Sequence, residues 1–244
     1  MSVRLTEIDL KAAFLEHARE CGMIDETSII ASEFSLGRAG RRVDLAILAG
    51  RFIGVEFKSK YDSLRRLGPQ LDAYTKCFDQ VILVVDERHL GGALSVAPTS
   101  VELWTVDDQA RLALVKRAIP SEDQSVLALA DLCAIRSLRR IASAPSGASR
   151  KKLSASLEMV PLSVIYEAAI VNFKDSFVQS SETFWGSIGS SKIDRSTLIA
   201  LSRFAPLRQK QSEQQDKEEA FWKAWANEAS AVLAKRDQSV VGIA

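Results

Sequence analysis

Two short apolar segments, residues 43–48 and 52–58, are separated by only three residues and constrain the fold more than any other feature of the chain. Each alternates apolar side chains with small or charged ones, as a strand with one buried face does. The side chains expected on the shared apolar face are Val43, Leu45, Ile47, Ile53, Val55 and Phe57. The short connection predicts that the two strands pair antiparallel as a hairpin.

The register of this hairpin follows from the apolar pattern, because a slip of one residue would turn every side chain to the wrong face. A loop over residues 49–51 pairs Leu45 with Val55 and Ile47 with Ile53. A two-residue turn would instead place Asp44 opposite Val55 and mismatch both faces. We therefore predict the three-residue loop.

In this register Asp44 lies directly opposite Glu56, on a face that also carries Lys58. Two facing carboxylates repel, so the pair needs a positive charge between them. Lys58 is one candidate and a divalent cation is the other. Oxygen ligands without histidine or thiolate favour a hard ion, Mg²⁺ or Mn²⁺. The small residues Ala46 and Gly54 beside the pair are expected to leave the face open to a phosphate.

The rest of the chain predicts an α/β fold followed by a helical region. The hairpin is preceded by a predicted helix over 6–21 and a strand over 27–34. It is followed by a helix over 62–78, kinked at Gly68-Pro69, and by strands over 81–85, 101–106 and 112–115. Helices are expected at about 125–141, 156–180, 194–204 and 213–236, with a small-residue linker at about 142–150. The predicted division is therefore a domain over 1–124 and an all-α C-terminal region over 125–244.

Composition excludes several classes of protein. The net charge of +1 is unlike that of a strongly basic nucleic-acid binder, although acidic residues are in excess before residue 126 and basic residues after it. Three scattered cysteines and two histidines argue against a disulfide scaffold or a zinc site. No apolar run is long enough to cross a membrane and no signal peptide is evident, so we expect a cytoplasmic protein without membrane contact.

The set Asp44, Glu56 and Lys58 on adjacent strands, within the order helix, three strands, helix, strand, resembles the PD-(D/E)XK nuclease superfamily. Residues 28–90 resemble more narrowly a small bacterial family of restriction-endonuclease-like proteins with the pattern D…ExKSxxDxxxRLxxQxxxYxxxFD. One departure is Val43, which stands where the superfamily has its eponymous proline and is not itself a ligand. The resemblance implies a restriction-endonuclease-like αβββαβ core, a mixed central sheet flanked by helices, within residues 1–124.

The resemblance also implies roles for individual residues. Asp44, Glu56 and the backbone carbonyl of Phe57 would bind Mg²⁺ or Mn²⁺, and Lys58 would orient or deprotonate the attacking water. A further carboxylate ligand would be Glu33 of the preceding strand, which we favour, or Glu16 of the first helix.

Other side chains would act around the metal. Gln70 and Tyr74, four residues apart on one helix face, would reach the metal-bound water or the nucleic-acid backbone, although Tyr74 also fits an apolar core stripe. Arg42, Lys60 and Arg65 would contact phosphates, whereas a solvated helix face is the simpler interpretation of Arg65.

The function predicted from these features is Mg²⁺-dependent hydrolysis of DNA in phage defence, a mobile element or DNA repair. The alternative is a catalytically silent nuclease fold that binds nucleic acid or a protein partner, a second copy included, through its helical region. A basic cluster around the linker would serve as a backbone clamp or simply as a solvated face; its residues are Arg136, Arg139, Arg140, Arg150, Lys151 and Lys152. In the simplest structural interpretation, Asp44 and Glu56 are ordinary polar positions paired with Lys58.

Overall fold

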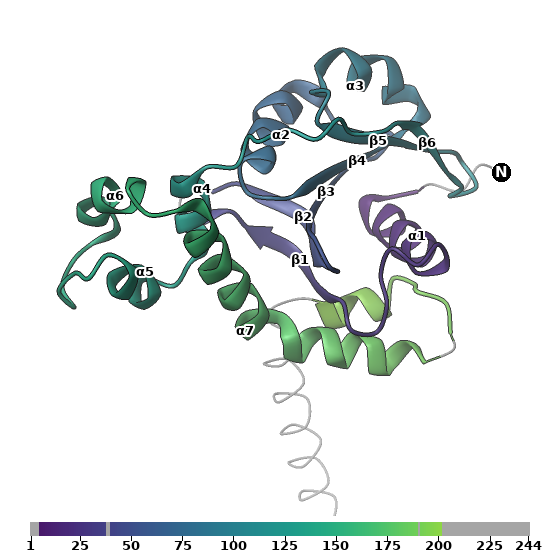
Figure 1. Cartoon of the computed structure of the whole chain (residues 1–244). Coiled ribbons are helices and arrows are strands. Elements are labelled where there is room, and N and C mark those ends of the chain that lie inside the picture. The colour runs from purple at the N-terminus through teal and green to yellow at the C-terminus, as the bar shows by residue number, and fades with distance from the viewer. Residues whose placement is uncertain (1–4, 38–39, 190, 202–244) are drawn as a thin grey trace, which may run out of the picture. The chain divides into compact units, whose positions relative to one another are not determined.

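The computed structural model describes residues 5–37, 40–189 and 191–201, and its centre is a six-stranded mixed sheet (Figure 1). The strands lie in chain order across the sheet. They are β1 (Ile29–Ser35), β2 (Arg42–Leu48), β3 (Phe52–Lys58), β4 (Gln80–Asp86), β5 (Val101–Val106) and β6 (Leu112–Lys116). Strands β3, β4 and β5 run parallel to their neighbours in that group, whereas β1, β2 and β6 each pair antiparallel. The predicted α/β class with a mixed, helix-flanked sheet is confirmed.

The predicted hairpin register is also confirmed. Leu45 pairs with Val55 and Ile47 pairs with Ile53 across β2 and β3. The ladder ends at Leu45, so Asp44 and Glu56 lie just beyond the last paired residues, where the two strands separate.

Each face of the sheet is covered by a helix from the α/β part of the chain (Figure 1). Helix α1 (Glu7–Glu20) packs against one face, and its Phe14 and Leu15 join the apolar side chains of β2 and β3 there. Helix α2 (Leu67–Thr75), preceded by the 3-10 turn η2 (Leu64–Arg66), packs against the other face. The short η3 (Glu87–His89) and α3 (Leu90–Val96) follow β4 on the α2 side.

One facing prediction was wrong, because Val43 does not share a face with Leu45 and Ile47. Val43 packs in the core on the α2 side, whereas Leu45 and Ile47 pack on the α1 side. The neighbouring strand β1 is irregular at the same level. Ser32 pairs with Leu45 and Phe34 pairs with Val43, and Glu33, which lies between Ser32 and Phe34, has a φ of +56°. A left-handed backbone at a residue other than glycine is uncommon, and here it interrupts the alternation of both strands.

The prediction that Gly54 leaves this face of the sheet open to a phosphate was wrong. A Cβ on Gly54 would lie 2.6 Å from the ring of Phe78, which follows α2 and covers this part of β3. The missing side chain therefore makes room for an aromatic ring of the core rather than for a phosphate.

The helical region begins with three short helices and continues into a long one. They are α4 (Val126–Leu132), α5 (Ile135–Ile141), α6 (Arg150–Glu158) and α7 (Leu162–Ile188). The helix predicted over 125–141 is interrupted at residues 133–134, and that predicted over 156–180 starts instead after Pro161 and extends to Ile188. Residues 142–149 form the expected connection. Residues Thr197–Leu201 form a 3-10 helix, η4, and the helix predicted over 213–236 lies outside the described residues.

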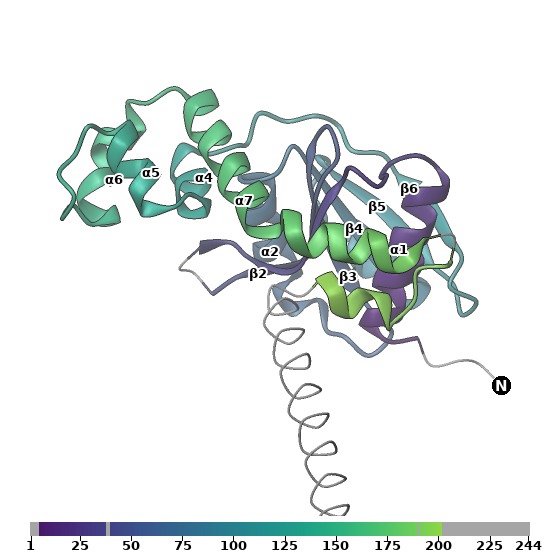
Figure 2. The same ribbon diagram turned by 90° about the horizontal axis from the view of Figure 1, so that it is seen from below.

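Helix α7 runs from the α4–α6 group along the edge strand β1 towards α1 (Figures 1 and 2). The buried Ser181 hydroxyl accepts the N–H of Ile30 at 2.9 Å, and Trp185 Nε1 donates to the carbonyl of Ser28 at 2.8 Å. The first half of α7 joins the core on the α2 side through Phe173, and the second half joins the α1-side core through Phe184. The helix thereby protects a strand edge that would otherwise expose unpaired backbone groups.

Because the helices share both cores with the sheet, the described residues form one compact unit. The boundary predicted at residues 124–125 falls inside this unit, at the start of α4. Within the described residues, no helix is both long and apolar enough to cross a bilayer.

Candidate functional site

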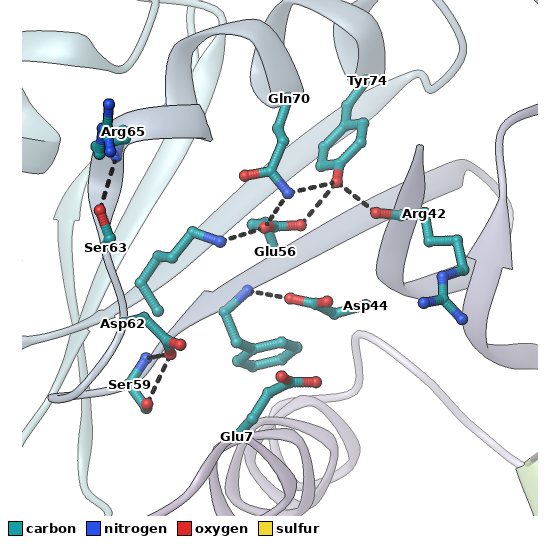
Figure 3. Close-up of polar contacts among 12 residues, drawn as sticks. Glu7, Arg42, Asp44, Glu56, Ser59, Asp62, Ser63, Arg65, Gln70 and Tyr74 are labelled. Carbon is teal, nitrogen blue, oxygen red and sulfur yellow. Dashed lines mark hydrogen bonds and ion pairs between the residues drawn. The ribbon is translucent and has the colours of Figure 1, made fainter. Parts of the chain in front are cut away.

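A pocket of about 460 Å³ opens where β2 begins and β3 ends, between α1 and α2 (Figure 3). Most of its lining side chains are charged or polar. The lining residues are Glu7, Glu33, Gly40, Arg41, Arg42, Asp44, Glu56, Phe57, Lys58, Asp62, Arg66, Pro69 and Gln70. All six residues favoured as catalytic or metal-binding are therefore brought together: Glu33, Asp44, Glu56, Phe57, Lys58 and Gln70.

Glu56 is the most deeply buried acid of the pocket, with only 1% of its surface exposed. Its Oε1 accepts hydrogen bonds from Lys58 Nζ at 2.6 Å and from Gln70 Nε2 at 2.8 Å. Its Oε2 lies 2.8 Å from the hydroxyl of Tyr74. Strand β3 supplies Glu56 and Lys58 two residues apart on one face, and α2 supplies Gln70 and Tyr74 one turn apart.

Tyr74 was predicted to contact nucleic acid, and its burial contradicts that role. The side chain is fully buried, and its hydroxyl lies 2.7 Å from the carbonyl oxygen of Arg42 as well as close to Glu56. Burial, followed by the negative charge of Glu56, raises the pKa of Tyr74 well above its usual range, so the phenol stays protonated and can donate. Tyr74 fixes the position of Glu56 instead of reaching a ligand.

Asp44 lies on the other side of the β2–β3 junction, close to α1 (Figure 3). Its Oδ2 accepts the backbone N–H of Phe57 at 2.7 Å, which takes the place of a ladder hydrogen bond. Burial, and then the nearby charge of Glu56, raises the pKa of Asp44 to about 8, although Lys11 and the Phe57 N–H act in the opposite direction. The carboxyl group therefore lies in surroundings that hold too little positive charge to keep it ionised.

A second set of acids surrounds Asp44. Carboxylate oxygens of Glu7, Glu33 and Asp44 all lie within 4.8 Å of one another. The ammonium of Lys11 lies 2.6 Å from Glu7 and 2.6 Å from Glu33, and the side chain of Lys11 is almost fully buried. Burial alone would lower the pKa of Lys11, but its two acidic partners outweigh burial and raise it. Glu56 does not belong to this set, so the acids divide between the α1 and α2 sides.

These contacts also show which of the two acids considered as a further metal ligand lies near Asp44. Glu33 lies beside Asp44, whereas Glu16 lies away from the pocket and binds Arg19 at 2.9 Å and the N–H of Ile193 at 3.0 Å. Sequence reasoning missed Glu7 and Lys11. The available signal was a Glu–Lys pair four residues apart at the start of the first helix, a spacing that is also common on solvated helix faces.

The rim of the pocket is basic and exposed. Arg42 lines it as predicted, with 64% of its side chain exposed, and Arg41 and Arg66 line it as well. The predicted contacts Arg65 and Lys60 do not line the pocket. Arg65 is exposed on η2 away from the pocket lining. Its neighbour Arg66 lines the pocket instead.

The residues of the pocket could hold a divalent cation. Their donors are carboxylate oxygens and the carbonyl of Phe57, which suit a hard ion of the Mg²⁺ type. The side-chain oxygen of Gln70 is buried and has no hydrogen-bond partner among the described residues, so it is free to accept from a bound water. The raised pKa of Asp44 fits the same interpretation, because a cation would favour its ionised form.

The basic cluster around the linker has two kinds of members. Arg139 donates to the carbonyl of Ala148 at 2.8 Å, and Arg150 donates to the carbonyls of Ala130 and Cys133. Both arginines therefore hold the short helices together. The remaining members, Arg136, Arg140, Lys151 and Lys152, are exposed.

The fold and this pocket define an α/β protein with a mixed six-stranded sheet and a polar, acid-rich site at the carboxyl end of β3. The chain belongs to the family of bacteriophage P4 protein cII, whose family model matches residues 1–202. It is 37% identical over 84 residues to Protein cII of Enterobacteria phage P4, a match that covers 34% of this chain and 31% of that protein. The match thus spans about a third of the length of this relative. No solved structure shows a significant match.

Proposed function

We propose that this protein is a metal-dependent nuclease of the PD-(D/E)XK type that hydrolyses phosphodiester bonds of DNA. The observation that carries the proposal is the single pocket lined by Asp44, Glu56, Phe57 and Lys58 at the β2–β3 junction. The strand alternation and the hairpin register in the sequence predict the same set of residues. Two acids, a lysine and a backbone carbonyl in one pocket suit metal-assisted attack of water on phosphate.

Each residue would have a distinct role. Asp44, Glu56 and the Phe57 carbonyl would hold Mg²⁺ or Mn²⁺, which supplies Lewis acidity and lowers the pKa of a bound water. Lys58, whose Nζ lies 2.6 Å from Glu56, is placed to orient that water and to neutralise charge that develops on the phosphate. Gln70 and Tyr74 keep the carboxylate of Glu56 in place through hydrogen bonds of 2.8 Å.

The substrate is a nucleic acid backbone, and we favour DNA. Arg41, Arg42 and Arg66 form an exposed basic rim above the acids, a combination that suits a phosphate approaching a metal. The family relationship to a phage protein favours a mobile-element or phage-defence setting over general repair. We propose that the protein acts in the cytoplasm, where phage DNA would be its substrate.

A second candidate function is a catalytically silent module that binds nucleic acid or a protein partner. Glu56 accepts hydrogen bonds from Lys58 and Gln70 and lies against the Tyr74 hydroxyl, and Lys11 pairs with two of the acids beside Asp44. Such a network can also fix the shape of a surface without chemistry. Partner binding would then use the exposed basic residues of α5 and α6.

The test uses the full chain with supercoiled and linear plasmid DNA, in Mg²⁺ or Mn²⁺ and in EDTA. We expect metal-dependent cleavage that falls about 100-fold or more in D44N and K58A, since each removes a group that stabilises developing charge. The matched control is K76A, because the exposed ammonium of Lys76, on the same side of the sheet, pairs with Asp72 at 2.8 Å. DNA binding without cleavage under any metal would favour the silent module. Cleavage that survives both substitutions would refute the proposed site.

A further inference from the structure

Lys11 is a buried lysine that the proposed chemistry does not use. It lies on α1 with 5% of its surface exposed, and its ammonium lies 2.6 Å from one carboxylate oxygen each of Glu7 and Glu33. The third acid of this set, Asp44, also acts on Lys11 through its charge. A lysine is rarely buried unless it is paired, and here the partners are the acids beside the proposed metal ligand.

The charges of the pocket divide into an inner and an outer group. The inner group contains the carboxylates of Glu7, Glu33, Asp44 and Glu56, with the ammonium groups of Lys11 and Lys58 at their end of the sheet. When all are ionised, two negative charges remain, which one divalent cation would neutralise.

The outer group contains Asp62 and three arginines, Arg41, Arg42 and Arg66, all of them exposed. This group is left with two positive charges. Arg42 Nε lies 3.9 Å from Glu33 Oε2 and so also contacts an inner acid, although most of the Arg42 side chain is exposed. Asp62 is also engaged in the loop after β3, where it accepts from the N–H and the hydroxyl of Ser59. The outer group therefore suits a phosphate. Its contact to the inner acids, the long and exposed pair of Arg42 with Glu33, is screened by solvent and is much weaker than the buried contact of Lys11.

The position of the Lys11 ammonium matters as much as its charge. The oxygens of Glu7, Glu33 and Asp44 lie within 4.8 Å of one another, close enough to surround one small cation, and the ammonium already contacts two of them. A divalent ion placed among these three oxygens would have to displace it. Asp44 also lies close to Phe57 and Glu56 of β3. A cation could therefore bind Asp44 on that side without displacing the Lys11 ammonium.

We infer that Lys11 is a positioning residue whose ammonium takes the place of a second divalent cation, so that the site holds one metal ion per chain. The inference rests on the proposed function, because it presupposes a metal at Asp44. It further assigns Glu7 and Glu33 to the support of Lys11 and Asp44 rather than to a second metal.

The experiment counts bound Mn²⁺ on the full-length chain by isothermal titration calorimetry and by electron paramagnetic resonance of the free ion. We expect one Mn²⁺ per chain for the unchanged protein and for K11R, and two for K11M, which removes the resident cation. The double variant E7Q/K11M, which removes one charge of each sign, should return to one. D44N should bind none.

The outcomes separate this inference from the proposed function. One Mn²⁺ in both the unchanged protein and K11M, or two in the unchanged protein, would overturn the role of Lys11 and leave the metal site standing. No Mn²⁺ in the unchanged protein would overturn both. If K11M does not fold without metal, its refolding on Mn²⁺ addition is followed by circular dichroism. A dependence on two ions supports the inference, and a dependence on one, or no recovery, overturns it.

Discussion

Replacing Asp44 with asparagine should stabilise the metal-free protein at alkaline pH. Burial and the charge of Glu56 raise the pKa of Asp44 from its ordinary 3.8 to about 8 in the folded protein. A carboxyl group whose pKa is raised on folding binds its proton more tightly in the folded state. The unchanged protein should therefore lose stability as the pH rises from about 4 to about 8. An asparagine in this position has no proton to lose, so that loss should disappear.

The size of the effect follows from the same values. One pKa unit corresponds to about 1.4 kcal/mol, so ionising Asp44 would cost the folded state at most about 6 kcal/mol above pH 8. The gain in the variant is smaller, because Lys11 loses a nearby negative charge. The asparagine oxygen can still accept the Phe57 N–H that Asp44 accepts at 2.7 Å. We expect a gain of about 1–3 kcal/mol at pH 8 and little at pH 5.

The assay is thermal and urea denaturation of both proteins in EDTA at pH 5, 6.5 and 8, repeated in Mg²⁺. For a unit of this size each kcal/mol corresponds to roughly 2–4 °C in Tm. Mg²⁺ should stabilise the unchanged protein, since a ligand that binds only the folded state does so, and should leave D44N unaffected. The matched control is D72N, an exposed acid on α2 that should change stability by less than about 0.5 kcal/mol at every pH.

An equal or lower stability of D44N at pH 8 in EDTA would refute the electrostatic reasoning. So would a gain that is as large at pH 5 as at pH 8, because the effect would then be one of packing. D44N could also show the expected pH-dependent gain in EDTA and yet be stabilised by Mg²⁺ as much as the unchanged protein. In that case any metal would bind elsewhere.

Two further substitutions test how the fold supports the pocket. S181A should cost about 1–2 kcal/mol in urea denaturation, because it leaves the buried N–H of the edge strand β1 without its acceptor on α7; S187A, on the same helix, is the control. G54A should cost about 1–3 kcal/mol, because the new Cβ would lie 2.6 Å from the Phe78 ring, whereas G91A on α3 meets nothing within 4 Å and should have a much smaller effect. A stable G54A protein would mean that the ring can move away.

The part of the site that the sequence predicted best depends on local periodicity. Alternation along β3 places Glu56 and Lys58 on one face, and helical spacing places Gln70 and Tyr74 one turn apart. Apolar matching also determined the register of β2 against β3. These relations involve residues close in sequence or joined by a short turn, so simple geometry was sufficient.

The part that could not be predicted depends on long-range packing. The packing of α1 against the sheet determines which turn of the helix lies over the β2–β3 junction. It therefore also determines that Glu7 and Lys11 lie close to Asp44. The change of face at Val43 lies beside the positive φ of Glu33 on the neighbouring strand, and no sequence pattern predicts that backbone conformation. The role of Gly54 depended on Phe78, 24 positions further along the chain.

The electrostatics of Asp44 bear on why such a cluster exists. A polar pair that served only the fold would be balanced, as Glu56 is by Lys58 and by two further hydrogen-bonding groups. Asp44 instead lies half-buried near three other acids with a pKa raised to about 8, which weakens the folded state at neutral pH. Residues that reduce stability in this way are concentrated at sites where a ligand restores the balance. The imbalance at Asp44, more than the presence of four carboxylates, is therefore the feature that favours a cation site over a structural ion-pair network.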